Sequence, residues 1–268
     1  MNEYLILTAV SLLISAIGFR YYIHFFSVGY GFSIAGLAIA MVILYLPNLT
    51  LPTIIMCSLL LIYGVRLGGF LLYRETKSAT YNQRVSGDIK DGKTVPFGVK
   101  VCIWLSCAFL YLCMTCPLAF RLEQPQVQDF LHFDIPSIVG LVLMFLGILM
   151  EIIADKQKAK AKKLNPGRFV DTGLYKFVRC PNYLGELLLW TGVFVTGVNM
   201  MSTWQWIFSI LGLILITYVM FSGARRLEVR QNKSYAKDPE YQKYVSTVPI
   251  LIPFLPLYSV IKYKFLVA

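Results

Sequence analysis

Long apolar segments alternate with polar connections along almost the whole chain of 268 residues. The apolar segments lie at about residues 4–23, 32–46, 51–73, 101–120, 135–154, 183–198 and 204–221. Most of them approach the roughly 20 residues that a helix needs to cross the hydrocarbon core of a bilayer. After the last of them, Asp238-Pro239-Glu240 predicts the start of a short helix, and residues 250–256 predict an apolar segment at the membrane interface. The pattern therefore predicts an all-α polytopic membrane bundle of about seven transmembrane helices.

The amino-acid composition favours a membrane domain over a soluble one. Hydrophobic residues make up 57% of the chain and charged residues only 15%, whereas a soluble domain carries about 25% charged residues. The first apolar segment has no Lys or Arg before it and no small-residue cleavage site after it. We therefore expect this segment to remain as a membrane helix rather than to be cleaved as a signal peptide.

The net charge of +11 would suggest nucleic-acid binding in a soluble protein. In a polytopic membrane protein, however, Lys and Arg concentrate in the cytoplasmic connections. All 25 basic residues except Arg66 and Arg121 fall on one side of a seven-span topology, including Arg84 and Lys90 after the third span. The charge therefore predicts a topology, with the N-terminus outside and the tail after Phe221 in the cytoplasm. It gives no reason to expect a nucleic-acid partner.

Few ionisable residues lie inside or at the edges of the predicted spans. They are Arg66, Glu151, Asp155 and Glu186. Each such residue costs about 2.5 to 3.5 kcal/mol on insertion scales, so each requires a cavity or a partner. Glu151 and Asp155 are four residues apart, which places both carboxylates on one face of the fifth predicted helix. An interhelical salt bridge would explain any one of these residues alone, whereas a binding site would explain their clustering.

The connection between the fifth and sixth spans has the features of an anion-binding loop. It contains Asn165-Pro-Gly-Arg-Phe169, Asp171-Thr-Gly-Leu-Tyr175 and Arg179-Cys-Pro-Asn-Tyr-Leu-Gly-Glu186. Pro181 suits the first position of a helix, and the positive end of that helix dipole would lie beside Arg179. Asn182 and Glu186 are again four residues apart on one face. Pro at a helix start and Gly at a packing contact are also common in membrane proteins, so the local pattern leaves both explanations open.

The run from Glu151-Ile-Ile-Ala-Asp155 through Asn165-Pro-Gly-Arg-Phe169 and Arg179-Cys-Pro-Asn-Tyr-Leu-Gly-Glu186 to Leu227-Glu228 resembles one known family. This is the steroid 5-alpha-reductase-like family of integral membrane reductases, in particular its bacterial branch of uncharacterised domain proteins. The resemblance covers about residues 151–256, with a fainter similarity at Tyr63-Gly-Val-Arg66 and Arg74. Isoprenylcysteine and phospholipid methyltransferases carry a segment similar to Arg-x-Pro-Asn-Tyr-x-Gly-Glu. The two upstream motifs make the similarity to the reductases more specific.

The resemblance implies a single membrane reductase domain over residues 1–268, with substrate-side helices in 1–150 and a cofactor-binding part in 151–256. Its cytoplasmic half would bind NADPH, and a lipid-accessible cavity would hold a steroid or a similar hydrophobic lipid. The residues implied for the cofactor are Glu151, Asp155, Lys162, Arg168, Arg179, Asn182, Tyr183, Glu186, Glu228 and Arg74. Tyr63 matches the family's carbonyl-polarising Tyr. The implied reaction is reduction of the C=C bond of a 3-oxo-Δ4 steroid or a similar enone lipid.

The sequence departs from the family pattern in three places. Cys180 stands where the bacterial branch usually has His. No acidic residue lies in the second or third predicted span to assist Tyr63. The family's steroid enzymes carry His or Tyr in the last cytoplasmic segment, where this chain has Glu228 and Gln231. Substrate activation and this end of the cofactor site are therefore open to a different arrangement.

Two other functions agree with part of the sequence pattern. An S-adenosylmethionine-dependent membrane methyltransferase acting on a lipid or a prenyl-cysteine would explain the motif at the sixth span. A lipid or proton carrier would use the intramembrane carboxylates. A metal site is not expected, because His24 and His132, the two histidines of the chain, are predicted on opposite sides of the membrane. Cys113 and Cys116 have redox spacing but lie in an apolar span, which favours packing thiols.

Overall fold

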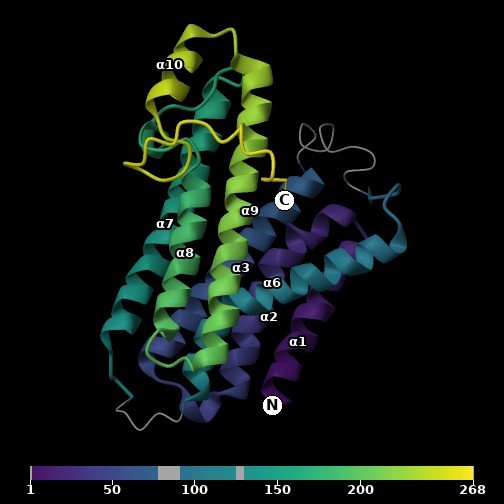
Figure 1. The fold of residues 1–268 in the computed structure, drawn as a ribbon, viewed down its shortest axis with the longest axis vertical. Helices are drawn as coiled ribbons and strands as arrows, with labels where there is room; N and C mark the ends of the chain where they lie inside the picture. The colour runs from purple at the N-terminus through teal and green to yellow at the C-terminus, as the bar shows by residue number, and fades with distance from the viewer. Residues whose placement is uncertain (1, 78–90, 125–129, 268) are drawn as a thin grey trace. The chain divides into compact units, whose positions relative to one another are not determined.

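The structure is a computed structural model that describes residues 2–77, 91–124 and 130–267 (Figure 1). Within these ranges the chain forms helices and no strands. The α-helices are α1 Asn2–Ser15, α2 Val28–Leu44, α3 Leu51–Lys77, α6 Phe97–Glu123, α7 Ile135–Leu164, α8 Pro181–Gly197, α9 Thr203–Tyr235 and α10 Pro239–Thr247. Short 3-10 helices occupy Ala16–Phe19, Tyr22–Phe25, Leu46–Asn48 and Gly173–Lys176. Arg84 and Lys90, two of the basic residues assigned to the cytoplasmic side, lie outside the described residues.

Six described segments are long and apolar enough to cross a membrane. They are Asn2–Phe19, Tyr22–Leu44, Leu51–Lys77, Phe97–Glu123, Ile135–Leu164 and Thr203–Tyr235. Each coincides with one of the seven predicted spans. The remaining span, predicted at 183–198, is α8, a shorter helix of 17 residues. The predicted all-α polytopic bundle is therefore confirmed, and the chain is a multi-pass membrane protein.

Two helices continue well beyond the apolar segments that predicted them. Helix α7 runs to Leu164 and α9 runs to Tyr235, whereas the apolar segments end near residues 154 and 221. Both extensions carry many charged side chains and few apolar ones, so hydropathy reports only the part of the helix that lies in hydrocarbon. The extra turns carry the polar side chains of the candidate site beyond the membrane-spanning part of each helix.

The chain divides into two compact units, of which the first comprises Met1–Leu141 and Val193–Gly212. In this unit α2 and α3 approach closely at Gly31 and Gly64. A Cβ atom on Gly31 would lie 2.4 Å from the backbone nitrogen of Gly68. Arg121, the basic residue that falls on the opposite side of the predicted topology, is buried; it pairs with Asp134 at 3.0 Å and donates to the carbonyl of Thr196 at 2.9 Å. Its charge is therefore neutralised inside the unit.

The second unit comprises Val142–Gly192 and Leu213–Ala268. Here α7 and α8 run side by side (Figure 1) and their backbones meet at Gly147 and Gly185. A Cβ atom on Gly185 would lie 2.7 Å from the carbonyl oxygen of Gly147, so any larger residue would force the two helices apart. The glycine next to Glu186 thus has a packing role.

The segment after α9 covers one end of the second unit. The predicted short helix is α10, and the Asp238 side chain caps it by accepting from the N–H groups of Glu240 and Tyr241. Within residues 250–256, Phe254 and Leu255 are exposed, whereas Ile250 and Leu251 differ from the predicted interfacial segment, because they are buried with Cys180 and Ala224 in the core of the unit. These two residues fill a core that forms only when the tail folds back on α8 and α9.

Candidate functional site

A chain of hydrogen bonds links the charged end of α7 to the start of α8. The Asn182 side-chain amide donates to Asp155 Oδ1, and Tyr175 Oη donates to Asn182 Oδ1 at 2.9 Å. Tyr244 of α10 donates in turn to the backbone carbonyl of Tyr175 at 2.8 Å. Asn182 is the second residue of α8, so its side chain is held at the helix start. Asp155 and Asn182 remain partly exposed, which leaves them accessible to a ligand.

Two buried carboxylates lie one helical turn away from this chain. Glu151 is 4% exposed and Glu186 is 7% exposed. Glu186 accepts a hydrogen bond from the indole N–H of Trp190 at 3.2 Å. Glu151 packs against α8, since a Cβ atom on Gly185 would lie 2.9 Å from Glu151 Cγ. The structure therefore brings Glu151, Asp155, Asn182 and Glu186 to the same end of the α7–α8 pair.

Arg179 and Glu228 form a buried ion pair in the second unit. Arg179 Nη2 lies 2.9 Å from Glu228 Oε1, and the two side chains are 2% and 4% exposed. Arg179 also donates to the carbonyl of Tyr258, and Glu228 accepts from the backbone N–H of Val260 at 2.9 Å. Arg179 Nε is buried and has no hydrogen-bond partner among the described residues. The pair joins the start of α8, the end of α9 and the tail.

Lys162, in the last turn of α7, and Arg168, in the loop that follows, lie close together. Lys162 Nζ donates to Tyr235 Oη at 3.0 Å and to the carbonyl of Arg168. The Arg168 guanidinium pairs with Asp171 at 2.8 Å and with Glu240 of α10. Both basic side chains are partly exposed. They therefore fasten the loop and α10 to α7 while still facing solvent.

An aromatic cluster covers this loop. Phe169 stacks on Tyr244 with ring centroids 5.3 Å apart and also contacts Tyr241. Burial raises the pKa of Tyr241 to about 12 and raises the pKa of Tyr175 and Tyr244 well above the ordinary tyrosine value. These hydroxyls therefore stay protonated at neutral pH and act as hydrogen-bond donors. Burial likewise raises the pKa of the Cys180 thiol to about 12, so this residue is not a reactive thiolate.

Tyr183, the remaining predicted cofactor residue of the second unit, faces α9. A Cβ atom on Gly223 would lie 3.2 Å from the Tyr183 ring. Gly223 thus leaves room for an aromatic ring against the helix. Among the described residues, no group of three or more His, Cys, Asp or Glu side chains is arranged to hold a metal ion.

Tyr63 and Arg74 belong to the first unit, on α3. Tyr63 is fully buried, and its hydroxyl donates to Tyr30 Oη of α2 at 3.0 Å. The Tyr30 ring stacks on Tyr111 with centroids 5.1 Å apart. Arg74 lies in the last turn of α3, partly buried, with its guanidinium 6.0 Å from the centre of the Phe70 ring. One hydrogen-bonding partner of Tyr63 is therefore a tyrosine.

Sequence reasoning missed three of the polar residues that complete these arrangements. Tyr30, Tyr175 and Tyr244 bond directly to Tyr63, to Asn182 and to the backbone of the loop. It also missed a buried pair in which His24 Nε2 lies 3.0 Å from Glu75 Oε2. All of these contacts join residues that are distant in sequence or in different elements, so no local spacing reveals them. The one available signal was a tyrosine, Tyr30, beside an otherwise apolar segment.

Comparison with known proteins gives a family and two curated relatives. The sequence profile of the family described as "Protein of unknown function (DUF1295)" matches residues 23–248. The chain is 29% identical over 120 residues to "Steroid 5-alpha-reductase DET2" of Arabidopsis thaliana, which covers 44% of this chain and 41% of that protein. It is 33% identical over 72 residues to the protein of the same name from Gossypium hirsutum, which covers 26% of each.

The chain thus matches less than half the length of either curated relative. No solved structure matches it significantly. The family profile, by contrast, covers most of the chain and includes every residue of the candidate site. The protein therefore belongs to the DUF1295 family, a steroid 5-alpha-reductase-like family as its sequence motifs predict.

Proposed function

We propose that the protein is an NADPH-dependent oxidoreductase that reduces the C=C bond of a 3-oxo-Δ4 steroid or a similar enone lipid. The observation that carries this proposal is the polar end of the α7–α8 pair, where Asp155, Asn182 and Tyr175 are hydrogen-bonded beside the buried Glu151 and Glu186. Both curated relatives are named steroid 5-alpha-reductases. This similarity supports a steroid reductase-like activity in a protein whose helices lie in the membrane with its hydrophobic substrate.

The residues of the second unit fit an anionic nicotinamide dinucleotide. Its nicotinamide carries a carboxamide, and Asp155 and Asn182 offer the acceptors and donors that an amide requires. Its phosphates require cations, which Lys162, Arg168 and the buried Nε of Arg179 supply. When bound, NADPH would supply the hydride. We assign Glu151, Tyr183 and Glu186 to the nicotinamide end, and Glu228 to a further contact of the same cofactor. Arg74 belongs to the other unit, and its contact with the cofactor stays a prediction.

Tyr63 would act on the substrate rather than on the cofactor. Its hydroxyl would donate a hydrogen bond to the ketone oxygen and stabilise the enolate-like charge that develops there. Tyr30 Oη, 3.0 Å away, could then donate to the Tyr63 oxygen and strengthen that donor. The fully buried position of Tyr63 favours this role, because a hydrogen bond is electrostatically stronger where water is excluded.

The proposed topology follows from the basic residues. We place the N-terminus outside and the tail after Phe221 in the cytoplasm, where NADPH is available. The single domain would then have its substrate-side helices in residues 1–150 and its cofactor-binding part in 151–256. The substrate would enter from the surrounding membrane lipids.

Replacement of Glu186 by Gln is expected to weaken NADPH binding by the purified protein in detergent about tenfold or more. Glu186 is buried beside Asn182 and hydrogen-bonded to Trp190, so loss of its charge changes the polarity of the nicotinamide end. Isothermal titration of NADPH into wild type and variant measures the change. Glu3→Gln, which removes one partly exposed carboxylate in the first turn of α1, is the matched control and should bind NADPH normally.

The same titration separates the reductase from a methyltransferase. S-adenosylmethionine carries a cationic sulfonium and only one carboxylate, so it gains little from Lys162, Arg168 and Arg179. We expect wild-type protein to bind NADPH and not S-adenosylmethionine. Binding of S-adenosylmethionine without NADPH would refute the proposed function.

A further inference from the structure

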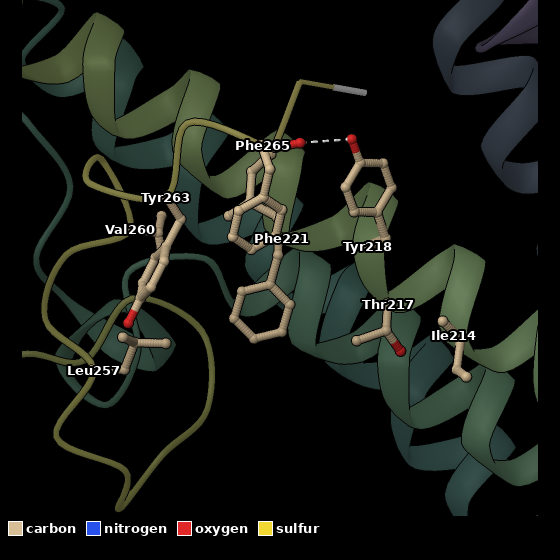
Figure 2. Close-up of a pocket in the computed structure, with 9 residues that line it drawn as sticks. Ile214, Thr217, Tyr218, Phe221, Leu257, Val260, Tyr263 and Phe265 are labelled. Carbon is tan, nitrogen blue, oxygen red and sulfur yellow. Dashed lines mark hydrogen bonds between the residues drawn. The ribbon is translucent and has the colours of Figure 1, made fainter.

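The tail of the second unit folds back along α9 and forms an apolar groove of about 400 Å³ (Figure 2). Ile214, Thr217 and Phe221 line it from α9, and Val260, Tyr263 and Phe265 line it from the tail. The α9 residues lie within the predicted membrane-spanning segment. The groove is therefore lined by apolar side chains and lies along a helix that is predicted to cross the bilayer.

Polar contacts fix both walls of the groove. Tyr218 Oη of α9 donates to the carbonyl of Phe265 at 2.8 Å, the contact drawn as a dashed line in Figure 2. About two turns further along α9, Arg225 Nε donates to the carbonyl of Ile261 at 3.2 Å. Because these two hydrogen bonds hold the tail against α9, both walls of the groove have a defined position.

Basic residues lie next to the tail wall of this groove: Lys262 Nζ is 5.1 Å from the centre of the Tyr263 ring, and Arg225 donates to the carbonyls of Ile261 and Leu266. Lys262 and Lys264 flank Tyr263, and both are exposed. Arg225 and Arg226 lie on the adjoining part of α9. Among the described residues none of these four cations has a carboxylate within salt-bridge distance. The groove therefore combines an apolar interior with a positively charged rim that attracts anions.

Phe254, also in the tail, indicates that this region contacts hydrocarbon. Its side chain is 100% exposed within the protein, and its backbone has φ of 67°, a conformation that bulky residues adopt only rarely. An aromatic ring held fully outward is unfavourable in water and favourable at a membrane interface. The tail thus has the characteristics of a segment that lies on the lipid surface.

We propose that the groove binds one acyl chain of an anionic phospholipid, with the lipid phosphate held by Lys262 and Lys264. A bilayer presents these two chemistries together, since each lipid joins a hydrocarbon chain to a phosphate headgroup. A neutral steroid would fill the groove but would leave the basic rim without a counterion. The groove adjoins the proposed cofactor site, because Glu228 accepts from the backbone N–H of Val260, but lipid binding in the groove does not depend on the reductase activity.

Native mass spectrometry of the purified protein with added phosphatidylglycerol or phosphatidylcholine tests this proposal. Wild-type protein should retain one phosphatidylglycerol about tenfold more strongly than phosphatidylcholine, because each lysine near an anionic headgroup contributes substantially to binding. The K262Q/K264Q variant should lose this preference. Thr217→Phe, which places a ring inside the groove, should lower the retention of both lipids.

The control variant is K233Q/K243Q, which removes two other exposed lysines of the same unit and should keep the preference for phosphatidylglycerol. Equal retention of the two lipids by wild type would overturn the proposal. An unchanged preference in K262Q/K264Q would overturn it as well, and this variant decides the question even where Thr217→Phe fails to fold. Unchanged retention in a folded Thr217→Phe protein would exclude the groove as the site.

Discussion

Tyr63→Phe is expected to lower the turnover number for an enone steroid about 100-fold while leaving the affinity for NADPH unchanged. The substitution removes one hydroxyl and keeps the ring that packs in the core, so the fold is preserved. Removal of a single preorganised donor to a developing oxyanion costs about 100- to 1,000-fold in other enzymes. Steady-state kinetics with saturating NADPH, together with a cofactor titration, measures both quantities.

The matched control for this variant is Tyr73→Phe, the same substitution on the same helix α3 at a residue that is 67% exposed. It should turn over at the wild-type rate. Tyr30→Phe keeps the Tyr63 hydroxyl and removes only the group bonded to it, so we expect a smaller loss than for Tyr63→Phe. Full activity of Tyr63→Phe would remove this residue from the mechanism.

Arg179→Met is expected to destabilise the second unit by about 3 to 5 kcal/mol, because it leaves Glu228 as a buried charge without its partner. For a chain of this size the loss corresponds to a melting temperature lower by about 10 °C. Thermal unfolding in detergent, followed by intrinsic fluorescence, provides the measurement. Glu228→Met should have a similar effect for the same reason.

A double variant separates the ion pair from the other contacts of the two residues. Arg179→Met combined with Glu228→Met removes both charges and should recover much of the lost stability, because neither side chain is then buried as an unpaired ion. Arg226→Met, an exposed arginine of α9, is the control and should melt near the wild-type temperature. A wild-type melting temperature for Arg179→Met would show that the ion pair does not stabilise the fold. Its contribution would then lie in cofactor binding alone.

The helical structure of the apolar segments in the described part of the chain could be predicted from the sequence because membrane spans have a strong one-dimensional signal. The end of α7 at Leu164 and the end of α9 at Tyr235 could not. Beyond the hydrocarbon the helices are stabilised by capping, by charge and by contacts with the loop and tail, and none of these is visible in hydropathy. The sixth predicted span, α8, is also shorter than most of the others, since Pro181 fixes where it begins.

The candidate site was predicted in part for a similar reason. The spacing of Glu151 with Asp155, and of Asn182 with Glu186, fixes which side chains share a helix face. It does not reveal that the two faces meet, which depends on the contact of α7 with α8 at Gly147 and Gly185. The tyrosines that complete the hydrogen bonds and the pairing of Arg179 with Glu228 arise from tertiary folding of distant segments.

We propose that the protein transfers hydride from NADPH to an enone lipid, and isotope transfer tests this proposal most directly. Purified protein would be incubated with NADPH deuterated at the transferable position of its nicotinamide and with a 3-oxo-Δ4 steroid. Mass spectrometry of the product should then show one deuterium at the carbon β to the ketone, with one NADPH consumed per steroid reduced. A steroid recovered unreduced, together with methylation of a lipid acceptor when S-adenosylmethionine is supplied, would contradict the account.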